Sequence, residues 1–108
     1  RNKDLIISGG YNIYPKEIEL IIDEQPGVGE SAVIGVPHEE FGESVVGILV
    51  SDGSGLLNLD QASRAIAASL AKFKQPRKLV VVDALPRNTM GKVQKNILRN
   101  TYKSVLSG

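Results

Sequence analysis

Ala32-Val33-Ile34-Gly35-Val36 is the stretch that decides the fold, together with Val45-Val46-Gly47-Ile48-Leu49-Val50 a few residues later. Both runs are short, continuously apolar and rich in valine and isoleucine, which is typical of buried strands. The residues between them, His38-Glu39-Glu40-Phe41-Gly42, are mostly polar and predict a loop. The sequence therefore predicts two core strands joined by a short loop.

The residues before the first core strand predict a hairpin and a helix. Leu5-Ile6-Ile7 and Tyr11-Asn12-Ile13-Tyr14 have the pattern of short strands, and Ser8-Gly9-Gly10 between them predicts a turn. Pro15 suits the first position of a helix. Isoleucines then recur at positions i, i+3 and i+4, as on the buried face of a helix: Ile18, Ile21 and Ile22.

The C-terminal half adds two helices and a third core strand. Asn58, with Gln61 three residues later, resembles a capping box, and the apolar spacing extends that helix to Phe73. Residues 79–82 predict a strand. A final helix from about Gln94 carries one face of Ile97, Leu98, Thr101, Tyr102, Val105 and Leu106. We expect an α+β fold, a small sandwich of a three-stranded sheet with two or three helices plus an N-terminal β-hairpin.

The composition is that of one folded domain. Hydrophobic residues make up 42% of the 108 residues, and no apolar run approaches the roughly 18 residues of a membrane span. The absence of cysteine excludes disulfides, thiolate zinc sites and cysteine nucleophiles, and is compatible with a reducing, cytoplasmic location. The chain begins at Arg1, inside a polar stretch and without methionine, so we expect a piece of a longer protein.

Charge is divided unevenly along the chain. Residues 1–71 hold four Lys/Arg and eleven Asp/Glu, a formal charge of −7, whereas residues 72–108 hold nine Lys/Arg and one Asp, a formal charge of +8. Such asymmetry suggests that the basic third faces an anion. The candidates are nucleic acid, a phosphate-bearing small molecule and an acidic protein surface, and the alternative is a solvated basic face.

A polar loop ends in Gly91-Lys92 and resembles a phosphate-binding loop only in part. The P-loop pattern Gly-x4-Gly-Lys-Ser/Thr requires a first glycine and a hydroxyl residue, but Pro86 and Val93 stand at these positions. What remains is Lys92 on a glycine-hinged loop ahead of a helix. A mobile ammonium suits a site where negative charge builds up, and the alternative is a solvated loop charge.

The Ser8-Gly9-Gly10 turn is the second candidate site. Two glycines allow a ligand to approach the backbone closely, or allow positive φ in a simple hairpin turn. Tyr11 and Tyr14 either line a narrow channel or pack on the sheet. Neither alternative is excluded by the sequence.

These segments, in this order, resemble the C-terminal domain of the acyl-CoA synthetases, which share a superfamily with peptide-synthetase adenylation domains and firefly luciferase. The resemblance covers nearly the whole chain. It is carried by Arg1-x-Lys3-Asp4-Leu5-Ile6-Ile7-Ser8-Gly9-Gly10-Tyr11-Asn12-Ile13-Tyr14-Pro15-x-Glu17-Ile18-Glu19, by residues 32–38 with Phe41-Gly42-Glu43, and by Lys72-Phe73-Lys74-x-Pro76 with Leu85-Pro86-Arg87-Asn88-x-x-Gly91-Lys92-Val93-x-Lys95-x-x-Leu98-Arg99.

The resemblance implies an acid–thiol ligase that forms AMP in two steps. A carboxylic acid attacks the α-phosphate of ATP, which carries Mg2+, to give an acyl-adenylate and pyrophosphate, and the CoA thiol then displaces AMP. Residues 1–108 would be the C-terminal lid, which rotates about a hinge near residues 1–4 against a large N-terminal domain that is absent here. The isolated domain is expected to be inactive, because it lacks both substrate pockets.

The resemblance also implies a role for each candidate residue. Lys92 would be the catalytic lysine of adenylation, Arg1 would contact the nucleotide, and Lys3 would be the hinge residue. Gly10 would lie against the pantetheine arm of CoA. The same CoA channel would be flanked by Ser8, Gly9 and Tyr11. Asn12 stands where some relatives have an arginine that contacts CoA, so another basic residue would hold the CoA phosphates.

The sequences of residues 9–19 and 86–96 are similar to those of malonyl-CoA and methylmalonyl-CoA synthetases. A fatty-acyl, aryl or carrier-protein ligase is the alternative with the same fold. A basic nucleic-acid-binding module is the alternative of another class, but the few aromatic residues do not suit a stacking surface, so we expect no nucleic acid as a partner. We expect no membrane partner either.

Pro86-x4-Gly91-Lys92 also resembles the site that protein lysine acetyltransferases modify in bacterial acyl-CoA synthetases. Acetylation would remove the charge of Lys92. The sequence therefore adds an acetyltransferase to the expected partners.

Overall fold

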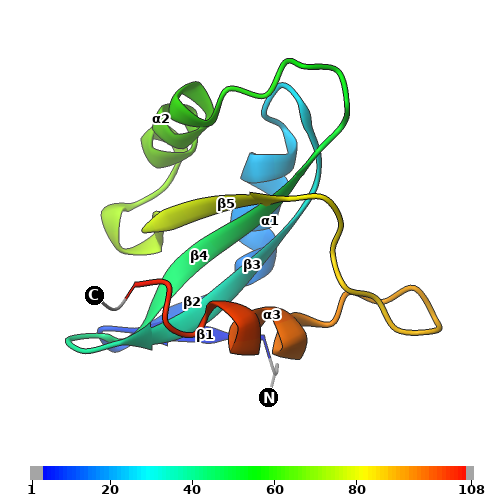
Figure 1. The fold of residues 1–108 in the computed structure, drawn as a ribbon. Helices are drawn as coiled ribbons and strands as arrows, with labels where there is room; N and C mark the ends of the chain where they lie inside the picture. Colours follow the sequence, from blue (N-terminus) through cyan, green and yellow to red (C-terminus); the bar gives the residue numbers. More distant parts are fainter. Residues whose placement is uncertain (1–3, 107–108) are drawn as a thin grey trace.

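A long antiparallel hairpin forms the centre of the structure, a computed structural model that describes residues 4–106 (Figure 1). Strands β3 (Val28–His38) and β4 (Gly42–Ser51) pair along almost their whole length. β5 (Lys78–Val82) runs parallel to β4 on its other edge. The three runs that the sequence predicts as core strands are therefore neighbours in one sheet.

The N-terminal hairpin joins this sheet at one end. β1 (Ile6–Ser8) and β2 (Tyr11–Ile13) pair in register, and the positive φ of Gly9 and Gly10 turns the chain between them. β1 meets β4 at the single pair Ser8↔Gly42. The predicted three-stranded sheet and hairpin are confirmed, and together they make five strands in the order β2-β1-β4-β3 with β5 beside β4.

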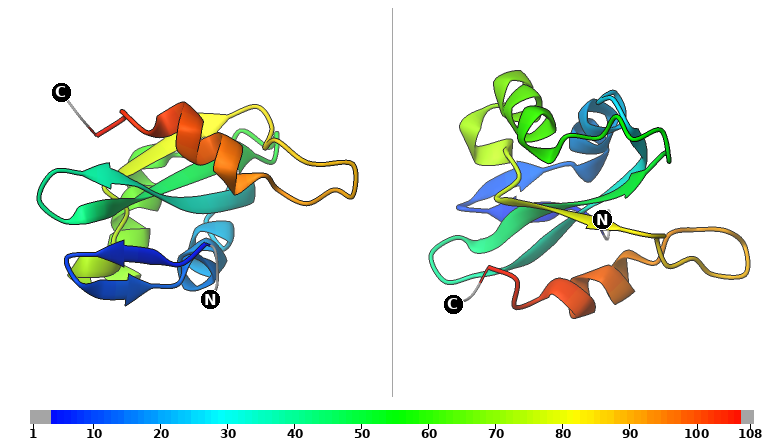
Figure 2. Two further views of the ribbon diagram at one scale, coloured as in Figure 1. Left: turned by 90° about the horizontal axis from the view of Figure 1, so that it is seen from below. Right: turned by 45° about the horizontal axis from the view of Figure 1, so that its top comes forward.

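Helices cover both faces of the sheet (Figure 2). α1 (Pro15–Asp23) and α2 (Leu59–Ser69) lie on one face, and α3 (Lys95–Tyr102) lies on the other. Alternate residues of each strand serve the two cores, because side chains of a strand point to opposite faces. The first core therefore contains Val33, Val45 and Leu49, and the second contains Ala32, Ile34, Val46 and Ile48.

Local signals in the sequence explain where α1 and α2 begin. Pro15 occupies the start of α1, where a missing N–H costs nothing. The Asn58 side chain caps α2 by accepting a hydrogen bond of 3.0 Å from the N–H of Gln61. Both predicted starts are confirmed.

Two helices end earlier than the sequence predicts. Leu70 has an extended backbone and ends α2, so Phe73 falls in the 3-10 helix η1 (Lys72–Lys74) and stays 40% exposed instead of entering the core. α3 ends at Tyr102, after which the chain tightens into turns, although Val105 and Leu106 still pack on the second core. Ile97, expected on the buried face, is exposed.

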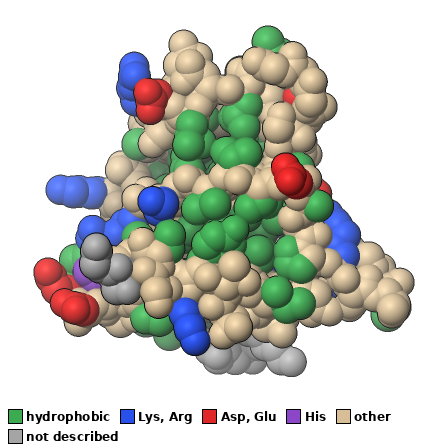
Figure 3. All heavy atoms as spheres, in the orientation of Figure 1, with side chains coloured by type: hydrophobic (Ala, Val, Ile, Leu, Met, Phe, Trp, Pro, Cys, Tyr) green, Lys and Arg blue, Asp and Glu red, His purple; other side chains and the backbone are tan. Residues whose placement is uncertain are grey.

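Apolar side chains reach the surface along β5. This strand pairs only with β4 within residues 4–106, and Val81 on it is exposed. In Figure 3, hydrophobic side chains gather across the middle of the face that carries β5. Part of the apolar surface of the sheet is thus not covered by the residues from Asp4 to Leu106.

Gly27 and Gly53 allow a stability prediction, because both have a φ of +84°. A Cβ at Gly27 would overlap the backbone of Leu56 and Leu57, whereas a Cβ at Gly53 would meet nothing within 4 Å. We expect Gly53→Ala to lower the free energy of unfolding by about 1 kcal/mol through φ alone, and Gly27→Ala by roughly 1–3 kcal/mol more, since backbone must move. Urea denaturation of both variants measures this difference, and equal losses would contradict the overlap.

Candidate functional site

The loop that carries Lys92 leaves the sheet after β5 and returns to start α3. An isolated bridge pairs Arg87 with Val93, and the Gln94 N–H donates to the carbonyl oxygen of Pro86 at 2.8 Å. The Asn88 N–H donates to the carbonyl oxygen of Lys92 at 3.0 Å. The loop is therefore a small closed hairpin with defined hydrogen bonds.

Asn88 fixes the tip of this loop. Its side-chain Oδ1 accepts hydrogen bonds from the N–H groups of Met90 and Lys92, each at 2.9 Å, and its carbonyl oxygen accepts from Gly91 at 3.0 Å. Gly91 has a φ of +83°, as this turn requires. Sequence reasoning treated the glycine as a hinge and missed Asn88, although asparagine is a known signal for such turns. In the structure the glycine completes a hydrogen-bonded turn.

Lys92 is exposed and differs from the cations around it. Each of the other basic side chains between residues 86 and 99 has a carboxylate partner: Arg87 with Glu30, Lys95 with Glu19 at 2.7 Å, and Arg99 with Asp4 at 3.5 Å. No carboxylate of residues 4–106 pairs with Lys92. Its ammonium is thus available to an anion from outside the domain.

The Ser8–Gly10 turn borders a pocket of about 590 Å3. The lining combines residues of the turn with the basic segment that precedes β5: Ser8, Gly9, Tyr11, Phe41, Ser44, Val45, Lys72, Phe73, Gln75, Pro76 and Arg77. Three of the four predicted channel residues therefore lie together. Gly10 does not line the pocket, and a Cβ there would meet nothing within 4 Å.

The pocket wall contains both aromatic rings and cations. Tyr11 and Phe73 stack with ring centroids 4.4 Å apart, and the Arg77 guanidinium lies 5.0 Å from the centroid of Phe41. Ser44 Oγ is buried without a hydrogen-bond partner in the structure. Rings beside cations, with a spare polar atom, suit a ligand that has both a planar group and phosphate. Sequence reasoning missed both rings, because it placed Phe41 in a loop and Phe73 on the buried face of a helix.

The two candidate sites lie at opposite ends of the molecule (Figures 1 and 2). β1 meets β4 at Gly42, whereas the loop of Lys92 follows β5, whose last pair with β4 is Val50↔Val82. Eight steps of about 3.3 Å along a strand separate these two points of β4, or roughly 26 Å. One ligand of moderate size cannot contact both sites.

Arg1 and Lys3 lie outside the described residues. Within residues 4–106 there is no group of three or more His, Cys, Asp or Glu side chains that could hold a metal ion. In the same range no helix is both long and apolar enough to cross a membrane.

Comparison with known proteins identifies the family. The AMP-binding enzyme C-terminal domain matches residues 17–92, which is more than half of the chain. The chain belongs to this family. That membership favours the ligase interpretation over the nucleic-acid-binding alternative, and the fold class is the one expected for such a domain.

Similar proteins are several times longer than this AMP-binding enzyme C-terminal domain. The long-chain-fatty-acid–CoA ligase FadD13 of Mycobacterium tuberculosis is 43% identical over 98% of this chain and 21% of its own length. Apo MatB from Rhodopseudomonas palustris is 58% identical, with a TM-score of 0.91 over 97% of this chain and 21% of that one. ATP-bound MatB is 57% identical over the same shares, with a TM-score of 0.92. The chain thus spans about a fifth of these relatives.

Proposed function

We propose that this chain is the mobile C-terminal lid of an ATP-dependent, AMP-forming acid–CoA ligase. The observation that carries the proposal is the position of two candidate sites at opposite ends of one sheet. A single active site in a larger domain meets them in turn only if the lid rotates between the two steps. The apolar surface along β5 supports a contact with such an N-terminal domain.

In the first step the carboxylate of the acid attacks the α-phosphate of ATP, and pyrophosphate leaves. Lys92 lies between the attacking carboxylate and the phosphate and stabilises the negative charge that shifts between them. Arg1 contacts the nucleotide, and Lys3 is the hinge about which the lid turns. Mg2+ would accompany ATP in the full-length enzyme and would offset the charge of its phosphates.

In the second step the turn of the N-terminal hairpin faces the active site, and the CoA thiol displaces AMP. Ser8, Gly9, Gly10 and Tyr11 flank the pantetheine arm. The open space around Gly10 within this domain supports this role, because the room there is left for something docked on the turn. The phosphorylated nucleotide end of CoA occupies the pocket, where Arg77 and Lys72 replace the charge that Asn12 does not supply.

The acid is malonate or methylmalonate. The similarity of residues 9–19 and 86–96 to malonyl-CoA and methylmalonyl-CoA synthetases supports this choice. A fatty-acyl ligase is the alternative, since FadD13 is 43% identical. Acid specificity resides in the N-terminal domain, so the two are separated by assaying the full-length enzyme.

Lys92→Ala in the full-length enzyme tests whether Lys92 acts in adenylation and not in thioester formation. We expect adenylate formation from ATP and malonate to fall about 100-fold or more, because a directed charge is lost. Thioester formation from supplied malonyl-adenylate and CoA should persist. Wild-type rates in both half-reactions would show that Lys92 is only a loop charge. In the unmodified enzyme, adenylation of a long-chain fatty acid in preference to malonate would favour the fatty-acyl ligase alternative.

Arg77→Ala tests the pocket. We expect the KM for CoA to rise about ten-fold through loss of a charge-assisted contact, while the KM for ATP stays unchanged. Arg64→Ala is the matched control, since Arg64 is an exposed arginine of α2 that does not line the pocket. A similar rise in both variants would indicate a general charge effect and not a CoA site.

Acetylation of Lys92 would regulate the first step by removing its ammonium charge. The exposure of the side chain at the loop tip supports access by an acetyltransferase. Mass spectrometry after incubation with a bacterial protein lysine acetyltransferase and acetyl-CoA should find Lys92 modified and adenylation lost. An unmodified Lys92 beside other acetylated lysines would exclude this form of regulation.

A further inference from the structure

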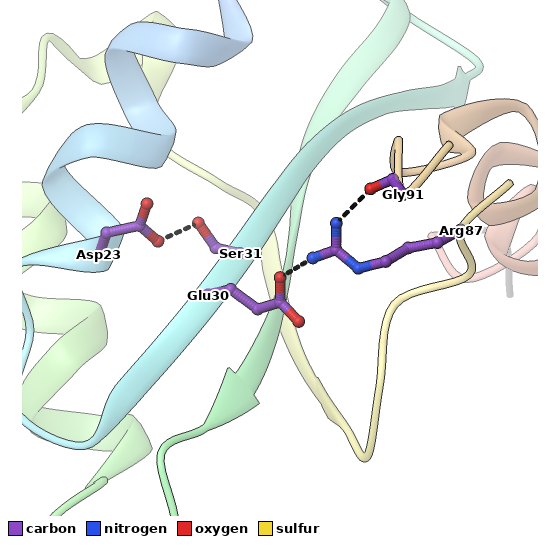
Figure 4. Close-up of polar contacts among 5 residues, drawn as sticks. All are labelled: Asp23, Glu30, Ser31, Arg87 and Gly91. Atoms are coloured by element: carbon purple, nitrogen blue, oxygen red, sulfur yellow. Dashed lines mark hydrogen bonds and ion pairs between the residues drawn. The ribbon is translucent and has the colours of Figure 1, made fainter. Parts of the chain in front are cut away.

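One arginine fastens the Lys92 loop to the sheet (Figure 4). The Arg87 guanidinium donates through Nη1 to the carbonyl oxygen of Gly91 at 2.7 Å and pairs through Nη2 with Glu30 Oε1. Glu30 belongs to β3, and Gly91 directly precedes Lys92. The planar guanidinium therefore spans the gap between the sheet and the backbone at the lysine.

The other flank of Lys92 is fastened to the same strand edge. Lys95 pairs with Glu19 at 2.7 Å, and Glu19 Oε2 also accepts a hydrogen bond of 2.9 Å from the N–H of Val33 in β3. These two side chains are only 15% and 14% exposed, against 42% and 38% for Arg87 and Glu30. The Lys95–Glu19 pair is built into the packing, whereas the Glu30–Arg87 pair is half open to solvent.

A half-exposed ion pair contributes little to folding stability, because solvent screens it. Its geometric effect is larger. The fork of Arg87 makes both contacts with one rigid plane, so the place of Gly91 is set relative to β3. A shift of about 1 Å in a charge that acts on a transition state can cost about 100-fold in rate.

We propose that Glu30 and Arg87 are positioning residues for adenylation. Glu30 orients Arg87, and Arg87 holds the Gly91 carbonyl. The backbone at Lys92 is thereby held at a defined position relative to β3. The proposal rests on the proposed function of Lys92. It assigns to a carboxylate on β3 an effect on only one of the two half-reactions.

Half-reaction kinetics of the full-length enzyme test the proposal with Glu30→Gln, Arg87→Gln and the double variant. We expect kcat of adenylation to fall about ten-fold in each single variant, with the KM for ATP unchanged. The double variant should be no slower than the slower single variant, because the two residues act as a unit. Thioester formation from supplied acyl-adenylate should stay within about two-fold of wild type.

Two further variants test whether the planar fork of Arg87 is needed for adenylation. Arg87→Lys keeps the charge opposite Glu30 but loses the fork, so its adenylation rate should lie between those of wild type and Arg87→Gln. Asp23→Asn is the matched control, because Asp23 accepts a hydrogen bond of 2.6 Å from Ser31 on the same strand edge without touching the loop (Figure 4). It should adenylate at the wild-type rate.

The outcomes separate this inference from the function on which it rests. Wild-type adenylation in Glu30→Gln, beside a strong loss in Lys92→Ala, would overturn the positioning role and leave Lys92 in place. Equal losses in both half-reactions would also overturn it, since the pair would then maintain the fold. Wild-type adenylation in Lys92→Ala would overturn the proposed function itself.

Discussion

The positions of both candidate sites depend on how the two edges of β4 pair with the other strands. β3 occupies one edge along almost its whole length, while the other edge is divided between β1 at Gly42 and β5 from Val46 to Val50. The Ser8–Gly10 turn therefore lies at the start of β4, and the Lys92 loop follows from its end. Backbone pairing, and not the conformation of either loop, keeps the two candidate sites apart. The proposed rotation of a lid uses this fixed separation of the two candidate sites.

Local patterns were sufficient to predict most of the fold. The three apolar runs, the glycine turn and the Asn58 cap depend on residues that are close in sequence, and each was found where expected. Phe73 shows where this reasoning fails. Its spacing fits the apolar face of α2, but Leu70 ends that helix, and the ring stacks on Tyr11 from a hairpin more than sixty residues earlier. Helical spacing carries no information on where a helix stops.

Only the local parts of the two candidate sites were predictable from the sequence. The Gly91-Lys92 step and the glycine turn were visible in the sequence, and Asn88 was visible in principle as a former of local turns. The contact between Arg87 and Glu30 was not, because it joins residues 57 positions apart through a strand edge whose position is a tertiary property. The same holds for the pocket, which combines the first hairpin with the segment before β5.

The outer edge of β3 explains how a basic segment presents one directed charge. Within residues 4–106 this strand pairs with a neighbour on one side only, and an open edge invites pairing with other chains. Side-chain contacts lie along this strand: Glu19 accepts a hydrogen bond from the backbone N–H of Val33, Asp23 accepts one from the Ser31 hydroxyl, and Arg87 pairs with Glu30. Two of these contacts also hold the cations that flank Lys92, since Lys95 pairs with Glu19. These contacts thus neutralise the cations on both sides of Lys92. Among the described residues of the loop, Lys92 has no carboxylate partner and can therefore bind an external anion.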